Sequence, residues 1–471
     1  MKILLTGTTG YIGKRLLPIL LAQNHEVFCC LRDKNRFYYP KMLENKIHVI
    51  EVDFLKKETL KVIPKDIDAA YYLVHSMSDS VDNYDELEHT SANNFVKKIN
   101  QTNAKQVIYL SGIVNSNSLS KHLSSRKHVE EILYTGKFAT TTLRAGIIIG
   151  SGSASFEIIR DLVNKLPFMI APKWINTKCQ PIAISDVLEF LSKSLLNPLT
   201  YNQSFDIGGA DVLTYKDMLM GFAKAKKLKR WIFSVPVMTP KLSSYWLYFI
   251  TSTSYKLASA LVSSMTVEVI CKDSKINMLL DINPMSYKEA LSKALIKINE
   301  NNVASSWKDS LISGLINGNI TEYLKIPTKN CYVDKRKIEI NDREFTIKRI
   351  WSIGGETGWY YSNWLWSLRG FIDKLFGGVG FERGRRDKYD IHAGDTLDFW
   401  RVIYANKEEG NLILFAEMKL PGKAWLEFKI IENILYQTAT FKPKGVCGKL
   451  YWYSVLPFHG LIFNGMLKRL I

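Results

Sequence analysis

The sequence predicts an α/β fold: a doubly wound parallel sheet of the Rossmann type with a substrate-side region, followed by an α+β domain with an antiparallel sheet and a long C-terminal helix. Three observations lead to this prediction. An apolar strand close to the first residue runs into three glycines spaced by three. Apolar strands and helical stretches alternate over the first 150 residues, as they do in parallel sheets with crossover helices. From about residue 335 the apolar residues recur with a period of two, which is typical of antiparallel strands.

The first strand and the turn after it carry the most specific signal. Gly7 allows a tight turn, Gly10 lets the backbone approach a pyrophosphate, and Gly13 lets the next helix pack closely on the strand. That helix, about Lys14 to Ala22, directs its first N–H groups and the positive end of its dipole at the phosphates. We therefore predict a dinucleotide-binding loop. Its candidate cofactor-binding residues are Thr6, Gly7, Thr9, Gly10, Tyr11, Ile12 and Gly13.

The second strand, Val27 to Leu31, indicates which dinucleotide is bound. An NAD-selective site places a carboxylate near the end of this strand, where it binds the ribose hydroxyls. Here Leu31 stands at that position and Arg32 follows it. A guanidinium holds a 2′-phosphate with two parallel hydrogen bonds, so we expect NADP(H) in preference to NAD(H). The alternative is that Arg32 is a solvated surface cation, as Lys34 beyond it would be.

The following strands and helices complete the predicted sheet. Asp53 and Phe54 come after the apolar run Ile47 to Val52, and we expect both beside the adenine ring. Further strands are predicted at Ala69–Val74, Gln106–Leu110 and Thr140–Leu143, with helices at Asp82–Asn100 and Ser124–Tyr134. We assign residues 1–150 to the NAD(P)-binding Rossmann core and residues 151–325 to the substrate-side remainder, which includes a late strand at 205–209.

Residues 335–471 form the predicted third segment. Strands are expected at Asp398–Ala405, Leu412–Met418, Trp425–Ile430 and Leu435–Phe441, and the segment Tyr451–Ile471 is expected to be helical after Pro457. Such a curved sheet around one helix can enclose an apolar cavity. Five aromatic residues are candidates to line the cavity or, alternatively, to fill a core: Trp400, Trp425, Phe428, Trp452 and Phe458.

Composition limits the classes of function. The chain has 471 residues, of which 46% are hydrophobic, which indicates a well-packed globular protein. The net charge of +18 favours anionic partners such as phosphates or a membrane surface, but the cations are spread along the chain and no nucleic-acid motif accompanies them. We therefore expect no nucleic-acid binding. Six scattered cysteines without a CxxC pair, and no apparent signal peptide, predict reduced thiols and a cytoplasmic location.

These motifs together resemble a known family. The N-terminal part resembles the extended and atypical short-chain dehydrogenase/reductases, which include the NAD-dependent epimerase/dehydratase type. Motifs that carry this resemblance are Thr6–Gly13, Asp53-Phe54, Leu143–Gly150, Gln180–Ile182 with Asp186-Val187, and Phe205–Gly209. Tyr72–Met77 and the C-terminal segment are similar to an uncharacterised bacterial subgroup in which a reductase-like domain is fused to a START-like or polyketide-cyclase-like domain. Motifs that carry this second resemblance are Gly377–Gly380, Arg383–Asp387 and Leu450–Tyr453.

The catalytic pattern that the resemblance implies is broken in this chain. Active members use a Tyr and a Lys four residues apart on a helix, with the lysine lowering the pKa of the phenol. In this sequence His122 and Arg126 stand at those positions. Ser111 ends its strand and is a candidate cofactor contact, but Gly112 and Ile113 follow it, so the supporting serine is displaced as well.

Two interpretations follow. In the first, His122 is an alternative general acid, Arg126 holds the ribose and phosphate region, and His75 assists from the end of its strand. The chain would then be an oxidoreductase acting on an apolar carbonyl, enone or quinone-like substrate. In the second, the site binds NADP(H) without turnover, and the protein is a sensor or assembly factor whose C-terminal domain binds a lipid-like ligand. His122 as an ordinary exposed residue stays open.

Two apolar stretches raise the question of a membrane. Leu450–Leu467 has eighteen residues without charge, long enough for a tail anchor, but Pro457, His459 and Asn464 lower its apolar content. We expect a helix that closes the antiparallel sheet, with peripheral contact with an inner membrane as the alternative. Ser243–Tyr255 is a second amphipathic candidate, expected to be a lid or an interdomain contact.

Overall fold

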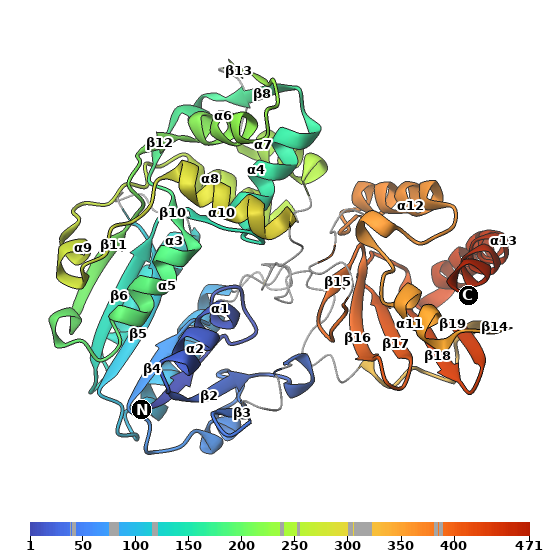
Figure 1. Ribbon diagram of the computed structural model, residues 1–471, viewed down its shortest axis with the longest axis horizontal. Helices are drawn as coiled ribbons and strands as arrows, with labels where there is room; N and C mark the ends of the chain where they lie inside the picture. Colours follow the sequence, from blue (N-terminus) through green and yellow to red (C-terminus); the bar gives the residue numbers. More distant parts are fainter. Residues whose placement is uncertain are drawn as a thin grey trace. The chain divides into compact units, whose positions relative to one another are not determined.

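The chain divides into two compact units, which Figure 1 colours from blue to yellow and from orange to red. The computed structural model describes residues 1–37, 39, 44–74, 84–114, 121–235, 240–251, 255–299, 305, 323–380, 385 and 390–471. The first unit comprises Met1–Lys34 and Tyr39–Ile312, and the second comprises Asn35–Tyr38 and Ser313–Ile471. Each unit has its own hydrophobic core.

The first unit is built on a seven-stranded sheet whose strands are all parallel. Its order is β11-β6-β5-β4-β1-β2-β3. The order reverses direction between β1 and its neighbour β4, and parallel sheets bind ligands at the carboxyl ends of strands at such a switch point. The predicted α/β fold is therefore confirmed. The strands are β1 (Lys2–Leu5), β2 (Glu26–Leu31), β3 (Ile47–Glu51), β4 (Ala69–Tyr72), β5 (Gln106–Gly112), β6 (Ala139–Ala145) and β11 (Gln203–Ile207).

Helices cover both faces of this sheet because successive strand residues point to opposite sides. Tyr72 packs its ring on Phe95 of α2 (Tyr84–Ile99), at a centroid distance of 4.7 Å. Its neighbour Tyr71 points to the other face, where its hydroxyl donates a 3.0 Å hydrogen bond to the carbonyl of Leu191 in α5 (Ile184–Lys193). Helix α3 (Lys121–Leu133) packs beside α2, and α1 (Gly13–Ala22) packs beside α5.

The rest of the first unit is mostly helical and has a separate core (Figure 1). Helix α4 begins after Ser153, whose hydroxyl accepts from the N–H of Phe156. Helix α6 begins with a capping box made by Thr214 and Asp217. Its helices are α4 (Ala154–Lys165), α6 (Tyr215–Ala225), α7 (Pro240–Ile250), α8 (Tyr255–Met265), α9 (Lys275–Leu280) and α10 (Tyr287–Asn299).

Three short strand pairs lie among these helices: β7 (Ile148–Ile149) with β10 (Ile182–Ala183), β8 (Phe168–Pro172) with β13 (Trp231–Val235), and β9 (Lys178–Cys179) with β12 (Leu213–Thr214). Short 3-10 helices are η1 (Lys34–Arg36), η3 (Lys57–Val62), η4 (Lys173–Asn176) and η5 (Pro198–Thr200).

The second unit is an antiparallel sheet with a long helix against it (Figure 1). The sheet order is β14-β19-β18-β17-β16-β15, so the first strand lies beside the last. Its strands are β14 (Tyr332–Glu339), β15 (Thr396–Leu397), β16 (Trp400–Asn406), β17 (Asn411–Ala416), β18 (Gly422–Ile431) and β19 (Ile434–Pro443). Its helices are α11 (Arg343–Ile350), α12 (Asn363–Leu375) and α13 (Gly445–Leu470), with the 3-10 turn η8 (Gly355–Thr357).

Helix α13 differs from the prediction at its start. It begins at Gly445 and continues through Pro457, whereas helix was expected only after that proline. Pro457 lies on the exposed side of the helix, so the ring meets solvent and only one backbone hydrogen bond is lost. The opposite side packs Trp452 and Phe463 against the sheet, which stabilises the helix on both sides of the proline. None of the helices in the described ranges is long and apolar enough to cross a membrane.

The aromatic residues predicted for a C-terminal cavity divide into two groups. Trp400, Trp425, Phe428 and Trp452 are buried. Trp400 and Phe428 belong to the hydrophobic core between the sheet and α13, as the alternative interpretation expected. Phe458 is 52% exposed, so its assignment to the cavity is wrong. The reason is helical phase, because the neighbouring His459 faces inward and Phe458 therefore faces solvent.

Candidate functional site

The glycine-rich loop lies between β1 and α1, at the carboxyl end of the first strand. Gly7 has a φ of +63°, and a Cβ there would lie 2.4 Å from the carbonyl oxygen of Leu73. A Cβ on Gly13 would lie 2.3 Å from the carbonyl oxygen of Gly7. Gly10 is less crowded, since a Cβ there meets only the Gly7 oxygen at 3.1 Å. Gly7 and Gly13 are thus required by the packing of the loop itself, while Gly10 leaves space beside its Cα into which a ligand can approach.

Two loop threonines stabilise the loop through their side chains. The Thr6 hydroxyl donates to the carbonyl of Tyr71 at 2.9 Å and accepts from the N–H of Leu73 at 2.9 Å. The Thr8 hydroxyl donates to the carbonyl of Leu5 at 2.8 Å. Thr6 therefore joins the ends of β1 and β4, and its side chain serves the loop. The predicted contacts Thr9 and Ile12 are half-buried, and Ile12 directly precedes α1.

Tyr11 is held from the far side of the loop by residues distant in sequence. The guanidinium of Arg15 lies 4.7 Å from the centroid of the Tyr11 ring. Arg15 also donates to the Ser305 hydroxyl at 2.8 Å and to the Ser151 carbonyl at 2.7 Å, while the Ser305 hydroxyl donates to the Tyr11 carbonyl at 2.9 Å. The Tyr11 hydroxyl is buried without a hydrogen-bond partner in the described part of the chain, and burial raises its pKa to about 12.

The end of β2 presents a cation to solvent. Arg32 is exposed, whereas the carboxylate of the next residue, Asp33, is only 2% exposed. The backbone N–H of Lys34 donates to Glu51 at 3.1 Å, which fixes the chain after the strand. The guanidinium of Arg32 is therefore presented where the sequence placed it, and the nearby carboxylate of Asp33 is turned into the protein.

Asp53 and Phe54 follow β3 as predicted, but both are used by the fold. A carboxylate oxygen of Asp53 accepts from the N–H of Leu55 at 3.1 Å. The ring of Phe54 is buried and packs edge-on against Phe95 at 5.5 Å and Tyr72 at 6.4 Å. Contact of either residue with adenine stays a prediction.

Two of the residues predicted to contact the cofactor, Ser111 and Arg126, each have a buried donor atom without a hydrogen-bond partner among the described residues. These atoms are the hydroxyl oxygen of Ser111 and Nε of Arg126. The Tyr109 hydroxyl approaches the Arg126 carbonyl at 3.4 Å. Next to Arg126, the Ser125 hydroxyl donates a 2.6 Å hydrogen bond to Glu88, which fixes α3 against α2.

Two predicted histidines are placed only in part. The backbone of His122 belongs to the first turn of α3, one turn before Arg126, and its side chain lies outside the described residues. His75 lies outside the described residues altogether. Their roles stay predictions. Among the residues that the structure describes, no group of three or more His, Cys, Asp or Glu side chains is placed to hold a metal ion.

These features fit a nicotinamide dinucleotide. The space beside Gly10 and the first turn of α1 suit the pyrophosphate, and the exposed guanidinium of Arg32 suits an adenosine phosphate. The unpaired donors of Ser111, at the carboxyl end of β5, and of Arg126, on α3, suit ribose hydroxyls. A bound reduced nicotinamide supplies a hydride to an electron-poor carbon of a substrate.

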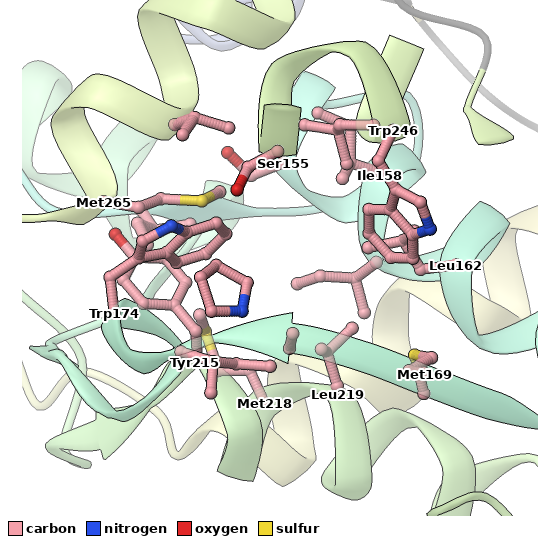
Figure 2. Close-up of a pocket in the computed structure, with 18 residues that line it drawn as sticks. Ser155, Ile158, Leu162, Met169, Trp174, Tyr215, Met218, Leu219, Trp246 and Met265 are labelled. Atoms are coloured by element: carbon pink, nitrogen blue, oxygen red, sulfur yellow. The ribbon is translucent and has the colours of Figure 1, made fainter. Parts of the chain in front are cut away.

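Beyond the sheet lies an apolar cavity, drawn in Figure 2 with the 18 residues that line it. It has about 730 Å³ of space between the atoms, including open solvent at its mouth. Ile147, just after the carboxyl end of β6, is one of its lining residues. Residues from α4, β8, α6, α7 and α8 form the other walls, including Ile158, Leu162, Met169, Met218, Leu219, Trp246 and Met265.

Few polar groups face this cavity. Tyr215 and Trp174 lie on one side of it and Trp246 lies on the opposite side (Figure 2). The rings of Trp174 and Tyr215 meet edge to face at 6.3 Å. In the described part of the chain, neither the Tyr215 hydroxyl nor the buried Trp174 Nε1 has a hydrogen-bond partner. Burial raises the pKa of Tyr215 well above its usual value. No pattern in the sequence indicates this pair, because Trp174 and Tyr215 are about forty residues apart.

Fold and site together define an NAD(P)H-binding domain of the Rossmann type within the first unit. Residues 7–151 match a protein family described as NAD(P)H-binding. Residues 327–466 match a second family, described as a protein of unknown function (DUF2867). A search of curated proteins finds no match to this chain.

Solved structures with the same fold include epimerases and a reductase. A nucleoside-diphosphate-sugar epimerase of Staphylococcus aureus matches with a TM-score of 0.51 and 16% identity, covering 62% of this chain and 99% of that one. An NADPH-dependent quinone oxidoreductase of Escherichia coli in complex with NADPH matches with a TM-score of 0.51 and 13% identity, covering 62% and 98%. An epimerase of Methanothermobacter thermautotrophicus matches with a TM-score of 0.50 and 14% identity, covering 64% and 92%. At these identities the likeness concerns the fold.

Proposed function

We propose that this protein is an NADP(H)-dependent oxidoreductase that reduces a carbonyl or a conjugated double bond of an apolar substrate. The apolar cavity that reaches the carboxyl end of β6 is the observation that carries the proposal. Cofactors bind at the carboxyl ends of the strands in this fold, and small molecules bind in concave, mostly apolar sites. A polar sugar nucleotide would leave its hydroxyls unpaired against such walls, so an apolar substrate is favoured.

Each candidate residue has a distinct task in this proposal. Arg32 holds the 2′-phosphate of NADP(H), and Ser111 with Arg126 holds the ribose next to the nicotinamide. His122 supplies the proton to the substrate oxygen, since imidazole changes its charge near neutral pH. The Tyr215 hydroxyl, one of the few polar groups in the lining of the cavity, orients the substrate by a hydrogen bond.

The test measures NADPH oxidation with a panel of quinones, enones and aldehydes. Leu219 lines the cavity and Leu188 of α5 does not, although both are buried to the same degree, with 7% exposed. Replacing either by Ala is expected to lower the free energy of unfolding by about 2–5 kcal/mol. Only Leu219→Ala is expected to raise the KM for apolar substrates. Equal changes in KM for the two variants would contradict the proposed substrate site, and unchanged turnover in His122→Ala would remove His122 from the mechanism.

A second candidate function is a sensor or assembly factor that binds NADP(H) without turnover. It is supported by the replacement of the Tyr and Lys pair by His122 and Arg126. Calorimetry and the substrate panel together separate the two functions. Tight NADPH binding without oxidation by any member of the panel would favour the sensor.

For the second unit we propose a START-like fold that binds an apolar molecule. One strand, two helices, five further strands and a final long helix follow each other in the chain, and the sheet order places β14 beside β19. This arrangement supports a sheet wrapped around α13. A cytoplasmic location is part of the same proposal, and the six free cysteines support it because thiols stay reduced there.

A further inference from the structure

Helix α12 of the second unit exposes an apolar stripe. Trp364, Leu368, Phe371 and Leu375 recur at intervals of three or four residues, so they lie on one face of the helix, and they are 67%, 46%, 57% and 57% exposed. The opposite face is buried and includes Trp366. A surface helix ordinarily turns polar residues to solvent, so the outer face of α12 is unusual for a helix that meets only water.

The first half of α13 repeats this arrangement. Val446, Leu450 and Tyr453 lie on one face and are 71%, 66% and 61% exposed. The other face buries Trp452 against the sheet. The two helices are neighbours, because the Arg369 guanidinium of α12 donates to the Tyr451 hydroxyl of α13 at 2.5 Å. We call the residues of these two stripes, Trp364, Leu368, Phe371, Leu375, Val446, Leu450 and Tyr453, the α12–α13 surface.

Cations of the C-terminal segment accompany this surface. The segment 441–471 contains five Lys or Arg residues and no Asp or Glu. Lys442 at the end of β19, Lys444 directly before α13 and Lys449 within α13 are close in sequence to Val446 and Leu450, and all three are exposed. Asp373, the acid within α12, is buried and accepts from backbone N–H groups of Gly380 and Lys419. The exposed charge near the apolar stripes is therefore positive.

We propose that the α12–α13 surface lies on an anionic lipid bilayer. Its aromatic and leucine side chains would enter the boundary between headgroups and acyl chains, while Lys442, Lys444 and Lys449 contact the phosphates. A second copy of the chain is disfavoured as the occupant, because a symmetric contact would bring these lysines, and two chains of net charge +18, against each other. In this proposal the helices lie along the surface of the bilayer and do not span it.

The test is sedimentation of the full chain with vesicles of two compositions. One is phosphatidylcholine alone, and the other is phosphatidylcholine and phosphatidylglycerol in equal parts. We expect binding to the anionic vesicles only, and weaker binding as salt is added. Replacing Lys442, Lys444 and Lys449 by Gln is expected to weaken binding about fivefold for each residue. The exposed lysines Lys56, Lys57 and Lys61 of the first unit, replaced in the same way, form a control with the same change in net charge.

The apolar part of the proposal has its own variants. Trp364→Ser and Phe371→Ser are each expected to weaken vesicle binding about tenfold or more. Met278→Ser on α9 is the control, because Met278 is 79% exposed and lies outside the surface. All these side chains are exposed, so the variants are expected to fold, and circular dichroism checks this. Equal loss in controls and variants, no binding to anionic vesicles, or a dimer that Trp364→Ser dissociates in the absence of lipid would overturn the proposal.

Discussion

At the scale of single residues, Arg32 sets the expected preference between the two nicotinamide cofactors. Arg32→Ala is expected to weaken NADPH binding about 10–100-fold, because a charge-assisted contact with a phosphate contributes ~1.5–3 kcal/mol. NADH lacks that phosphate, so its affinity is expected to stay unchanged. Isothermal titration calorimetry measures both, with Lys34→Ala as the control for an exposed cation nearby. An equal loss of affinity for NADPH and NADH would show that Arg32 does not contact the 2′-phosphate.

His459 makes the second unit sensitive to acid. Burial, together with the nearby Arg369 and Arg336, lowers the pKa of His459 to about 4, although Asp334 at 3.9 Å opposes this. The unfolded chain therefore binds a proton between about pH 6.5 and pH 4 that the folded chain does not bind. Stability contributed by the neutral imidazole is present above this window and is lost as the pH falls through it.

Acidification from pH 7 to pH 4 is expected to lower the free energy of unfolding by about 3 kcal/mol through this residue. His459→Phe removes the titrating group and keeps a ring beside Trp452 and Phe463. Urea unfolding of both proteins at several pH values measures the difference. His128→Gln, an exposed position on α3, is the control and is expected to follow the parent chain. Identical pH profiles for the parent and His459→Phe would contradict the prediction.

The residues of the cofactor site could be predicted from the sequence where the local backbone conformation or contacts with neighbours in the sequence determine which residue type is required. Gly7 and Gly13 are such cases, since steric contacts within the loop require them. Phe54 is the opposite case. Its position after β3 is correct, but its ring joins the core because Phe95 and Tyr72, distant in sequence, make room for it. The contact between Arg15 and Ser305 spans 290 residues and has no local signal.

At the scale of secondary structure, the alternation of apolar and polar residues predicted the strands that have one buried face. Four strands of the second unit lie within a few residues of their predicted positions. Strand β14 was missed because its inward side chains include Asp334 and Arg336, which pair with each other at 2.9 Å. An ion pair on the inner face replaces the apolar alternation on which such a prediction depends. Pairing with β19, about a hundred residues later, is what makes this segment a strand.

Pro457 interrupts the backbone hydrogen bonds of α13, and we expect this to lower the free energy of unfolding. Pro457→Ala restores one N–H donor and relieves the contact between the ring and the preceding turn. The free energy of unfolding of the second unit is expected to rise by about 1–3 kcal/mol. Because the proline is exposed, no cavity is created. Chemical denaturation followed by far-UV circular dichroism measures the change, and a decrease in stability would show that the proline fits a bend that α13 needs.

At the scale of the whole molecule, the division into two units predicts two thermal transitions. NADPH is expected to raise the transition temperature of the first unit alone, since a ligand stabilises the state that binds it. Phe428→Ala removes a fully buried ring from the core of the second unit and is expected to cost about 3–5 kcal/mol there. Leu188→Ala is the matched change in the first unit. Calorimetry in which Phe428→Ala and NADPH move the same transition would contradict independent units.

The hydrogen bond that Ser305 donates to Tyr11 and the one that it accepts from Arg15 also constrain how the protein matures during synthesis. The glycine-rich loop is translated well before one of its supports, Ser305, which follows Tyr11 by 294 residues. Domains generally fold as units while the chain emerges. The nascent loop therefore lacks its hydrogen bonds with Ser305 until nearly the whole first unit has been made. Full affinity for the dinucleotide is reached only then.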